Sequence, residues 1–153
     1  MAYWLMKSEP EELSYADLVA RKRAGWDGVR NHQAKNFLRR MALGDRAIFY
    51  HSSTTPPGAA GICRIAGTAE PDPTQFDPAS HYYDPTSRRD DPRWDWVTVA
   101  PVKRFARYVP LDELRTLPEL AGCRLLARGN RLSVMPLTDA EFAAIARAGG
   151  VRV

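Results

Sequence analysis

Aromatic side chains and polar side chains that can recognise a nucleobase alternate along this chain at predicted strand ends and loops. An aromatic face can stack on a planar ring, and short polar side chains can hydrogen-bond its edge. Stacking contributes roughly 1–3 kcal/mol per base. The pattern therefore predicts a pocket for a flipped or single-stranded base, unless most of the aromatic rings simply form the core. The aromatic residues concerned are Trp4, Trp26, Phe49, Tyr50, Phe76, Tyr82, Tyr83, Trp94 and Trp96, and the polar ones are Lys7, Ser8, Asn31, His51 and Ser52.

Basic residues near these positions are candidates for contacts with phosphate groups. Lys35, Arg88 and Arg89 are the main candidates, and Arg30 is close to the aromatic Trp26. The pair Arg39-Arg40 is more typical of a solvated helix face. The formal net charge of +4 favours a polyanionic partner only weakly.

Motifs of common enzymes and metal sites are missing from the sequence. There is no P-loop, GxGxxG or GxSxG pattern, and the three histidines are not spaced as metal ligands. The one enzymatic arrangement to retain is Lys7, Ser8 and Glu9 at a strand end, since burial can activate a lysine. The other interpretation is that Lys7 is a donor to a ligand or a surface charge, so we expect a binding protein without cofactor or metal.

Length and composition indicate one globular unit. The chain has 153 residues, 44% of them hydrophobic and 26% charged, which is ordinary for a single domain. Cys63 and Cys123 stand far apart and are expected to be reduced thiols. No apolar segment reaches membrane-spanning length and no secretory signal is visible, so we expect a cytoplasmic and bacterial protein, or a nuclear one in a eukaryote.

Three helices have clear start signals. Ser14 with Asp17 predicts a capping box for a helix that runs to about Ala24 and is closed by Gly25. Asn31 is the expected N-cap of an amphipathic helix whose apolar residues Ala34, Phe37, Leu38 and Met41 share one face, with Gly44 after its end. Thr138 with Glu141 predicts the last helix, which ends at residues 149–150.

Short strands are expected between these helices. The patterns place them at residues 3–7, 46–51, 61–69, 94–102 and 131–135, with the second and third paired as a hairpin. A short helix is expected at 110–115 with a further turn at 118–120, and residues 71–93 form a long loop. Because strands and helices do not alternate regularly, we expect an α+β fold, a small and mostly antiparallel β-barrel with helices outside.

Six segments together resemble the EVE domain family over essentially the whole chain. They are Tyr-Trp-Leu-Met-Lys-Ser-Glu-Pro (3–10), Trp-Asp-Gly-Val-Arg-Asn (26–31), Phe-Tyr-His-Ser (49–52), Thr-Gln-Phe-Asp-Pro (74–78), Pro-Arg-Trp (92–94) and Arg-Leu-Ser-Val (131–134). The resemblance implies a single domain over residues 1–153 with a PUA-like fold, related to the YTH readers of methylated adenine. It also implies binding of DNA or RNA that carries a modified base, either a methylated or hydroxymethylated cytosine or a methylated adenine. Modified cytosines in DNA are the favoured ligands of eukaryotic members.

The same resemblance assigns roles to individual residues. Lys7-Ser8 and Trp26 fall on YTH positions that read and stack the base, and the loop through Asn31 would bond its edge. Residues 50–52 would form the other wall, and Phe76 or a neighbour such as Tyr82 or Tyr83 would close the cage. The residues expected in the pocket are Lys7, Ser8, Trp26, Gly28, Val29, Arg30, Asn31, Tyr50, His51, Ser52, Phe76 and Trp94.

Two alternatives remain at this stage. The PUA-related ASCH proteins include hydrolases of modified nucleosides, for which Lys7 and Glu9 would be the catalytic candidates. A PUA-like interaction module without base specificity is the other. The modified base, the choice between DNA and RNA, and the oligomeric state are left open by the sequence.

Overall fold

The computed structural model describes residues 1–152 and is built around one curved, six-stranded sheet with the strand order β2-β5-β4-β3-β1-β6. Strands β1 and β3 are parallel, and the other neighbouring pairs are antiparallel. The strands are β1 (Tyr3–Ser8), β2 (Ala24–Gly25), β3 (Arg46–His51), β4 (Gly58–Pro71), β5 (Asp95–Pro110) and β6 (Val134–Leu137). The expected α+β class with a largely antiparallel sheet is confirmed.

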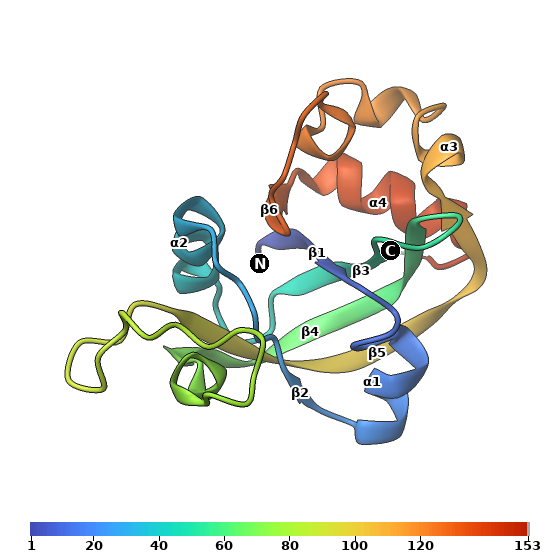
Figure 1. The fold of residues 1–153 in the computed structure, drawn as a ribbon. Coiled ribbons are helices and arrows are strands. Elements are labelled where there is room, and N and C mark those ends of the chain that lie inside the picture. Colours follow the sequence, from blue (N-terminus) through green and yellow to red (C-terminus); the bar gives the residue numbers. More distant parts are fainter. Residues whose placement is uncertain (153) are drawn as a thin grey trace.

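Helices pack around this sheet. Helix α4 (Asp139–Ala148) covers the face formed by β1 and β3, and α1 (Tyr15–Arg21) lies against β5 (Figure 1). Helix α2 (His32–Arg40) packs against both β6 and β5, so it completes the wall between the two ends of the curved sheet. The shorter helices are α3 (Leu111–Leu114), η1 (Pro73–Phe76), η2 (Pro118–Leu120) and η3 (Arg124–Leu126).

The expected helix caps are present. The Ser14 hydroxyl accepts the Asp17 N–H at 3.0 Å while the Asp17 carboxylate accepts the Ser14 N–H at 2.9 Å. Thr138 and Glu141 form the same reciprocal pair at the start of α4, and Asn31 caps α2. These side chains satisfy backbone donors that the first helical turn leaves free.

One helix end was predicted incorrectly. Helix α1 ends at Arg21, because Lys22 adopts a left-handed conformation with φ 69° and its N–H bonds back to the Leu18 carbonyl. Residues 24–25 leave the helix and pair with Val99 and Thr98 of β5 as strand β2. Gly25 is thus a strand residue and not a helix stop, and the Trp96 ring packs so closely on it that an added Cβ would lie 2.3 Å from a ring atom.

The strands differ from expectation mainly in length. Strands β4 and β5 are longer than predicted because they form one extended hairpin, from Gly58 paired with Pro110 to Pro71 paired with Asp95. Strand β6 begins at Val134 and not at residue 131, since its pairing with β1 starts where Val134 faces Met6. Pro136 is tolerated in β6 because that strand is at an edge of the sheet.

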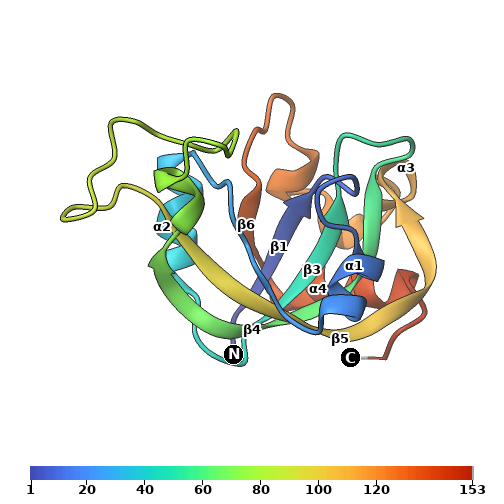
Figure 2. The same ribbon diagram turned by 60° about the horizontal axis from the view of Figure 1, so that its bottom comes forward.

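The long segment 71–93 extends beyond α2 and is irregular apart from η1 (Figure 2). Buried polar groups hold it in place. The Gln75 amide donates to the carbonyls of Asp72 and Trp94 at 2.8 and 2.7 Å, and its oxygen accepts the Trp94 N–H at 3.0 Å. The loop therefore has a defined conformation without regular strands.

Candidate nucleobase pocket

A cavity of about 510 Å³ lies at the ends of β1 and β3, within the size range of small-molecule sites. Several segments that are far apart in the sequence form its walls. They are the end of β1 with the turn after it (residues 7–9 and 12–13), Arg21, the segment 25–29 that leads toward α2, Ser52, residues 80–82 of the long loop, and residues 131–133 before β6. We call this cavity the β1-end pocket.

Lys7 and Ser8 reach the β1-end pocket from the last two positions of β1. Burial lowers the pKa of the Lys7 ammonium, and its Nζ lies 5.9 Å from the centre of the Tyr50 ring. The Ser8 hydroxyl donates to the Leu13 carbonyl at 2.8 Å, which leaves its oxygen free to accept a hydrogen bond. Lys7 therefore offers donors and Ser8 an acceptor to a ligand.

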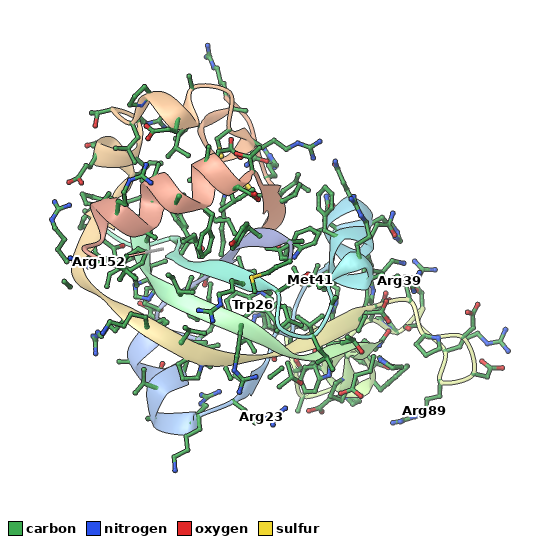
Figure 3. The ribbon with its side chains drawn as sticks, turned by 180° about the vertical axis from the view of Figure 1, so that it is seen from behind. Arg23, Trp26, Arg39, Met41, Arg89 and Arg152 are labelled. Carbon is green, nitrogen blue, oxygen red and sulfur yellow. The ribbon has the colours of Figure 1, made fainter. Side chains whose placement is uncertain are left out.

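Trp26 belongs to the wall of the pocket and to the hydrophobic core at once. Its indole is only 4% exposed and meets Phe49 edge-on, with ring centres 5.2 Å apart. Its backbone N–H donates to the Val97 carbonyl at 2.8 Å, which fixes the segment next to β5. Figure 3 shows Trp26 in the interior of the molecule. The ring therefore has a defined position between the core and the cavity.

Tyr82 is the aromatic residue of the long loop that lines the pocket. Its ring covers Gly28, which has φ +78°, and a Cβ on that glycine would lie 2.4 Å from the Tyr82 ring. Phe76, the expected cage residue, does not line the pocket. The Arg89 guanidinium carbon lies 4.8 Å from the centre of its ring. Tyr83 is 42% exposed and is also outside the lining. Of the three aromatic residues considered for this loop, Tyr82 is thus the one that lines the cavity.

Residues 80–82 are tied across the mouth of the pocket to Glu12. The Tyr82 hydroxyl donates to the Glu12 carboxylate, and His81 Nε2 lies 3.0 Å from the other Glu12 oxygen. Burial, together with this contact to Glu12, raises the pKa of the Tyr82 phenol. The long loop and the turn after β1 therefore enclose the pocket from one side.

Arg30 and Asn31 support the pocket without lining it. The Arg30 guanidinium lies 3.1 Å from the Asp72 carboxylate and donates to the Tyr82 carbonyl at 2.8 Å. Asn31 uses its side-chain oxygen to accept the Ala34 N–H at 2.9 Å. Val29 and Gly28 do line the pocket. The arginine thus holds the long loop over the segment 25–29.

Of residues 50–52, only Ser52 lines the β1-end pocket. Tyr50 is 3% exposed, and burial raises its pKa to about 12. His51 accepts the Tyr15 N–H through Nε2 at 3.1 Å, while burial and the charge of Arg104 lower its pKa. The Ser52 N–H donates to the Ser8 carbonyl at 2.9 Å, which continues the pairing of the two strands into the pocket.

Trp94 also lies outside the lining of the pocket, contrary to expectation. It is 6% exposed, stacks on His32 with ring centres 4.8 Å apart, and donates through its indole N–H to Asp84 at 2.7 Å. It anchors the long loop to the start of α2.

The three expected phosphate-binding residues have partners within the protein. Lys35 donates to the Arg93 carbonyl at 3.0 Å, and Arg88 pairs with Asp90 at 2.6 Å. Arg89 lies over Phe76 at the outer part of the loop (Figure 3). None of these three residues lines the β1-end pocket, whereas Arg21 and Arg131 do.

Several pocket residues were missed by sequence reasoning, above all the carboxylates Glu12 and Asp27. Burial raises the pKa of Asp27, and the nearby charges of Asp72 and Glu12 add to this effect. Asp27 could have been found from its position directly after Trp26. Arg131 and Leu132 are brought to the pocket by long-range pairing, for which the sequence carries no local signal.

Metal-ligand clusters are absent from residues 1–152: no three His, Cys, Asp or Glu side chains are grouped so as to hold an ion. The cysteines Cys63 and Cys123 are buried free thiols, and burial raises the pKa of both. Within the same residues no helix is long and apolar enough to cross a membrane.

The curved mixed sheet with its flanking helices and a pocket at the ends of two parallel strands defines a PUA-like α+β fold. The EVE domain model matches residues 2–148. The chain belongs to the EVE domain family, as the sequence resemblance indicated.

Among curated relatives, mouse thymocyte nuclear protein 1 is 46% identical to this chain in an alignment 159 positions long. The alignment covers 92% of this chain and 70% of the mouse protein. The human protein is 43% identical and is covered to 71%. A crystal structure of a Pseudomonas syringae protein is 48% identical, with a TM-score of 0.94 over 97% of this chain and 99% of that one.

Two further structures resemble this chain. Human thymocyte nuclear protein 1 in complex with DNA that contains 5-methylcytosine is 41% identical, with a TM-score of 0.92 over 100% of both chains. An ASCH protein of Zymomonas mobilis is 11% identical with a TM-score of 0.51 over 93% of this chain and 94% of that one. The second likeness concerns the fold alone.

Proposed function

We propose that this protein reads a modified cytosine in DNA by holding the base in the β1-end pocket. The observation that carries the proposal is the combination of the rigid Trp26 ring with the donors and acceptors of Lys7, Ser8 and Ser52 around one cavity. The human relative that binds 5-methylcytosine DNA supports it, since the two chains superimpose over their full length.

The base has to leave the double helix to reach this pocket. The Trp26 ring lies inside the molecule and only its cavity side is open, so a stacked base pair cannot contact it. Proteins that need access to one base flip it out of the duplex at a cost of a few kcal/mol. Stacking on Trp26 and hydrogen bonds from Lys7 would offset that cost.

Lys7 is the donor best suited to a base edge. It is half-buried and its pKa is lowered by desolvation, whereas Arg30 is occupied by Asp72 and Tyr82. A donor without a protein partner gains most from a ligand acceptor. Arg21 and Arg131, at the edge of the cavity, are placed for the phosphates beside the flipped nucleotide.

The test is a binding titration at physiological salt with short DNA duplexes that carry one 5-methylcytosine or one unmodified cytosine. We expect the methylated duplex to bind more tightly. We expect Trp26→Leu, which keeps apolar volume but removes the π face, to weaken binding by roughly 10-fold or more, as loss of base stacking does. Trp96→Leu is the matched control, because Trp96 lies outside the lining of the pocket.

Other outcomes would favour the other functions. Equal and strongly salt-dependent binding to both duplexes would indicate that the protein binds DNA only through its basic surface, without recognition of the base. Turnover of an acylated nucleoside that disappears in Lys7→Ala would favour a hydrolase. Lys7 with its lowered pKa is compatible with that chemistry, but Glu9, the expected carboxylate partner, is exposed and forms no ion pair with Lys7 within residues 1–152.

A further inference from the structure

A pocket that binds 5-methylcytosine must distinguish it from thymine, because thymine carries the same methyl group. The two bases differ at position 4, where cytosine has an amino group that donates and thymine has a carbonyl that accepts. Stacking on Trp26 and apolar contact with the methyl group are the same for both. They differ also at N3, which accepts in cytosine and carries a proton in thymine. Selectivity at position 4 can come from a side chain that accepts a hydrogen bond from the amino group and cannot donate one to the carbonyl.

Three acidic side chains line the β1-end pocket: Glu9, Glu12 and Asp27. Glu12 is occupied, since it binds the Tyr82 hydroxyl and pairs with His81. Glu9 and Asp27 are both exposed residues, and neither carboxylate receives a hydrogen bond from another residue within 1–152. Asp27 differs from Glu9 in its position, because it directly follows Trp26 in the wall of the pocket, where burial raises the pKa of its carboxyl.

The backbone around Asp27 is held firmly, so its side chain starts from a defined position. The preceding residue, Trp26, donates its N–H to Val97. The following residue, Gly28, donates its N–H to the buried Asp72 carboxylate at 3.0 Å and is covered by the Tyr82 ring. A carboxylate directly after the stacking aromatic ring is well placed to meet the edge of a base that lies on that ring.

We infer that Asp27 is the specificity-determining residue of the pocket: its carboxylate accepts a hydrogen bond from the 4-amino group of a cytosine-type base and repels the 4-carbonyl of thymine. This inference rests on the proposed function and adds the choice of base to it. A thymine in the same position would place its carbonyl oxygen against the carboxylate with no proton between them. An unpaired acceptor of this kind, away from water, carries the full cost of its desolvation.

The electrostatic surroundings of Asp27 favour a ligand group that donates a hydrogen bond to its carboxylate. The charges of Asp72 and Glu12 disfavour another carboxylate here, and burial acts in the same direction, while Arg30 opposes them. Lys7 and Arg21 are the basic side chains that line the pocket from β1 and α1, and Arg131 does so from the segment before β6. The amino group of a bound base would donate the hydrogen bond that no residue within 1–152 donates to the Asp27 carboxylate.

The test compares single-stranded DNA oligonucleotides that differ at one position, which is 5-methylcytosine, cytosine or thymine. Single strands remove differences in the cost of opening a base pair. For the wild type we expect 5-methylcytosine to bind at least about tenfold more tightly than thymine, the discrimination typical of one good polar contact. In Asp27→Asn the amide can turn to donate or accept, so we expect the preference over thymine to fall to about twofold or less while the preference over cytosine is retained.

Asp91→Asn is the matched control, since it makes the same change of charge at an exposed loop residue outside the pocket. Circular dichroism of each variant verifies that it is folded. An unchanged ratio of 5-methylcytosine to thymine binding in folded Asp27→Asn would overturn the inference and leave the proposed function standing. A wild type that binds methylated and unmethylated oligonucleotides equally would instead contradict the proposed function itself.

A second readout separates a contact from a structural effect. If the ionised Asp27 rejects thymine, protonation of its carboxyl should remove that rejection, because a neutral carboxyl can donate to the 4-carbonyl. The wild-type preference over thymine should therefore fall as the pH is lowered. The fall should be smaller in Asp27→Asn, where only protonation of N3 of the cytosine base itself contributes. An equal change of the ratio with pH in the wild type and in Asp27→Asn would contradict the inference.

Discussion

The Arg30 guanidinium and the Asp72 carboxylate form an ion pair of 3.1 Å that joins the segment next to Trp26 to the start of the long loop. The Asp72 side chain is fully buried and that of Arg30 is 22% exposed. Asp72 also accepts the N–H groups of Gly28 and Thr74. One charged pair thus holds together two walls of the β1-end pocket.

Arg30→Met is expected to destabilise the protein strongly. The substitution keeps an apolar stem but leaves the buried Asp72 charge without its cation, and breaking such a pair costs about 3–5 kcal/mol. Urea unfolding at pH 7 measures the free energy of unfolding. In the double variant Arg30→Met, Asp72→Asn the loss should be smaller than the sum of the two single losses, and strict additivity would contradict the coupling.

Gly28→Ala is expected to displace Tyr82 from the pocket. A Cβ at residue 28 would collide with the Tyr82 ring, and φ +78° itself costs a non-glycine residue about 1–2 kcal/mol. The variant should lose both stability and base binding. In the background Tyr82→Leu the steric part of the penalty should shrink, so a double-mutant cycle that shows no interaction between residues 28 and 82 would refute the predicted collision.

Trp26→Ala is expected to unfold part of the population and not only to empty the pocket. The ring is 4% exposed and packs on Phe49, and truncation of a buried aromatic ring costs about 3–5 kcal/mol. Thermal unfolding of Trp26→Ala and Trp26→Leu measures this difference. A Trp26→Ala variant as stable as wild type would show that the ring serves the pocket alone.

The stability of the protein is expected to fall below about pH 6.5 because of His51. Burial and Arg104 lower the pKa of His51 in the folded state, while the unfolded chain has the ordinary value of about 6.5. The contribution of His51 to the free energy of unfolding is complete above pH 6.5. As the pH falls through that value, the unfolded state takes up a proton before the folded state does, so the free energy of unfolding decreases.

His51→Gln should show a smaller loss of unfolding free energy between pH 7.5 and about pH 5.5 than the wild type. The glutamine can still accept the Tyr15 N–H but does not titrate. An identical acid loss in wild type and His51→Gln would assign the effect to other groups.

Features that depend on a few neighbouring residues were predictable from the sequence. The capping boxes at Ser14 and Thr138 and the cap at Asn31 rest on contacts within one helical turn, and all three are present. The end of α1 was not predictable in this way. Pairing of residues 24–25 with β5 decides it, and their partners lie more than seventy residues further along the chain.

The same distinction applies to the pocket. Lys7, Ser8 and Trp26 stand at the end of a strand and in a short segment before a helix, and the sequence indicates both. The choice of Tyr82 over Phe76 follows from how Arg30 and Glu12 hold the long loop. Those contacts bridge distant parts of the chain, so composition and spacing carry no signal for them.

The position of β1 between β3 and the edge strand β6 has a consequence for how the protein folds. The pairing of the first strand is complete only after residues 134–137 have formed β6 beside it. Pairing between the first and the last strand has a high sequence separation, which slows folding. Because residues 131–133 enter the pocket only through this pairing, the ability to bind a base should appear in the last kinetic phase of refolding, after most secondary structure has formed.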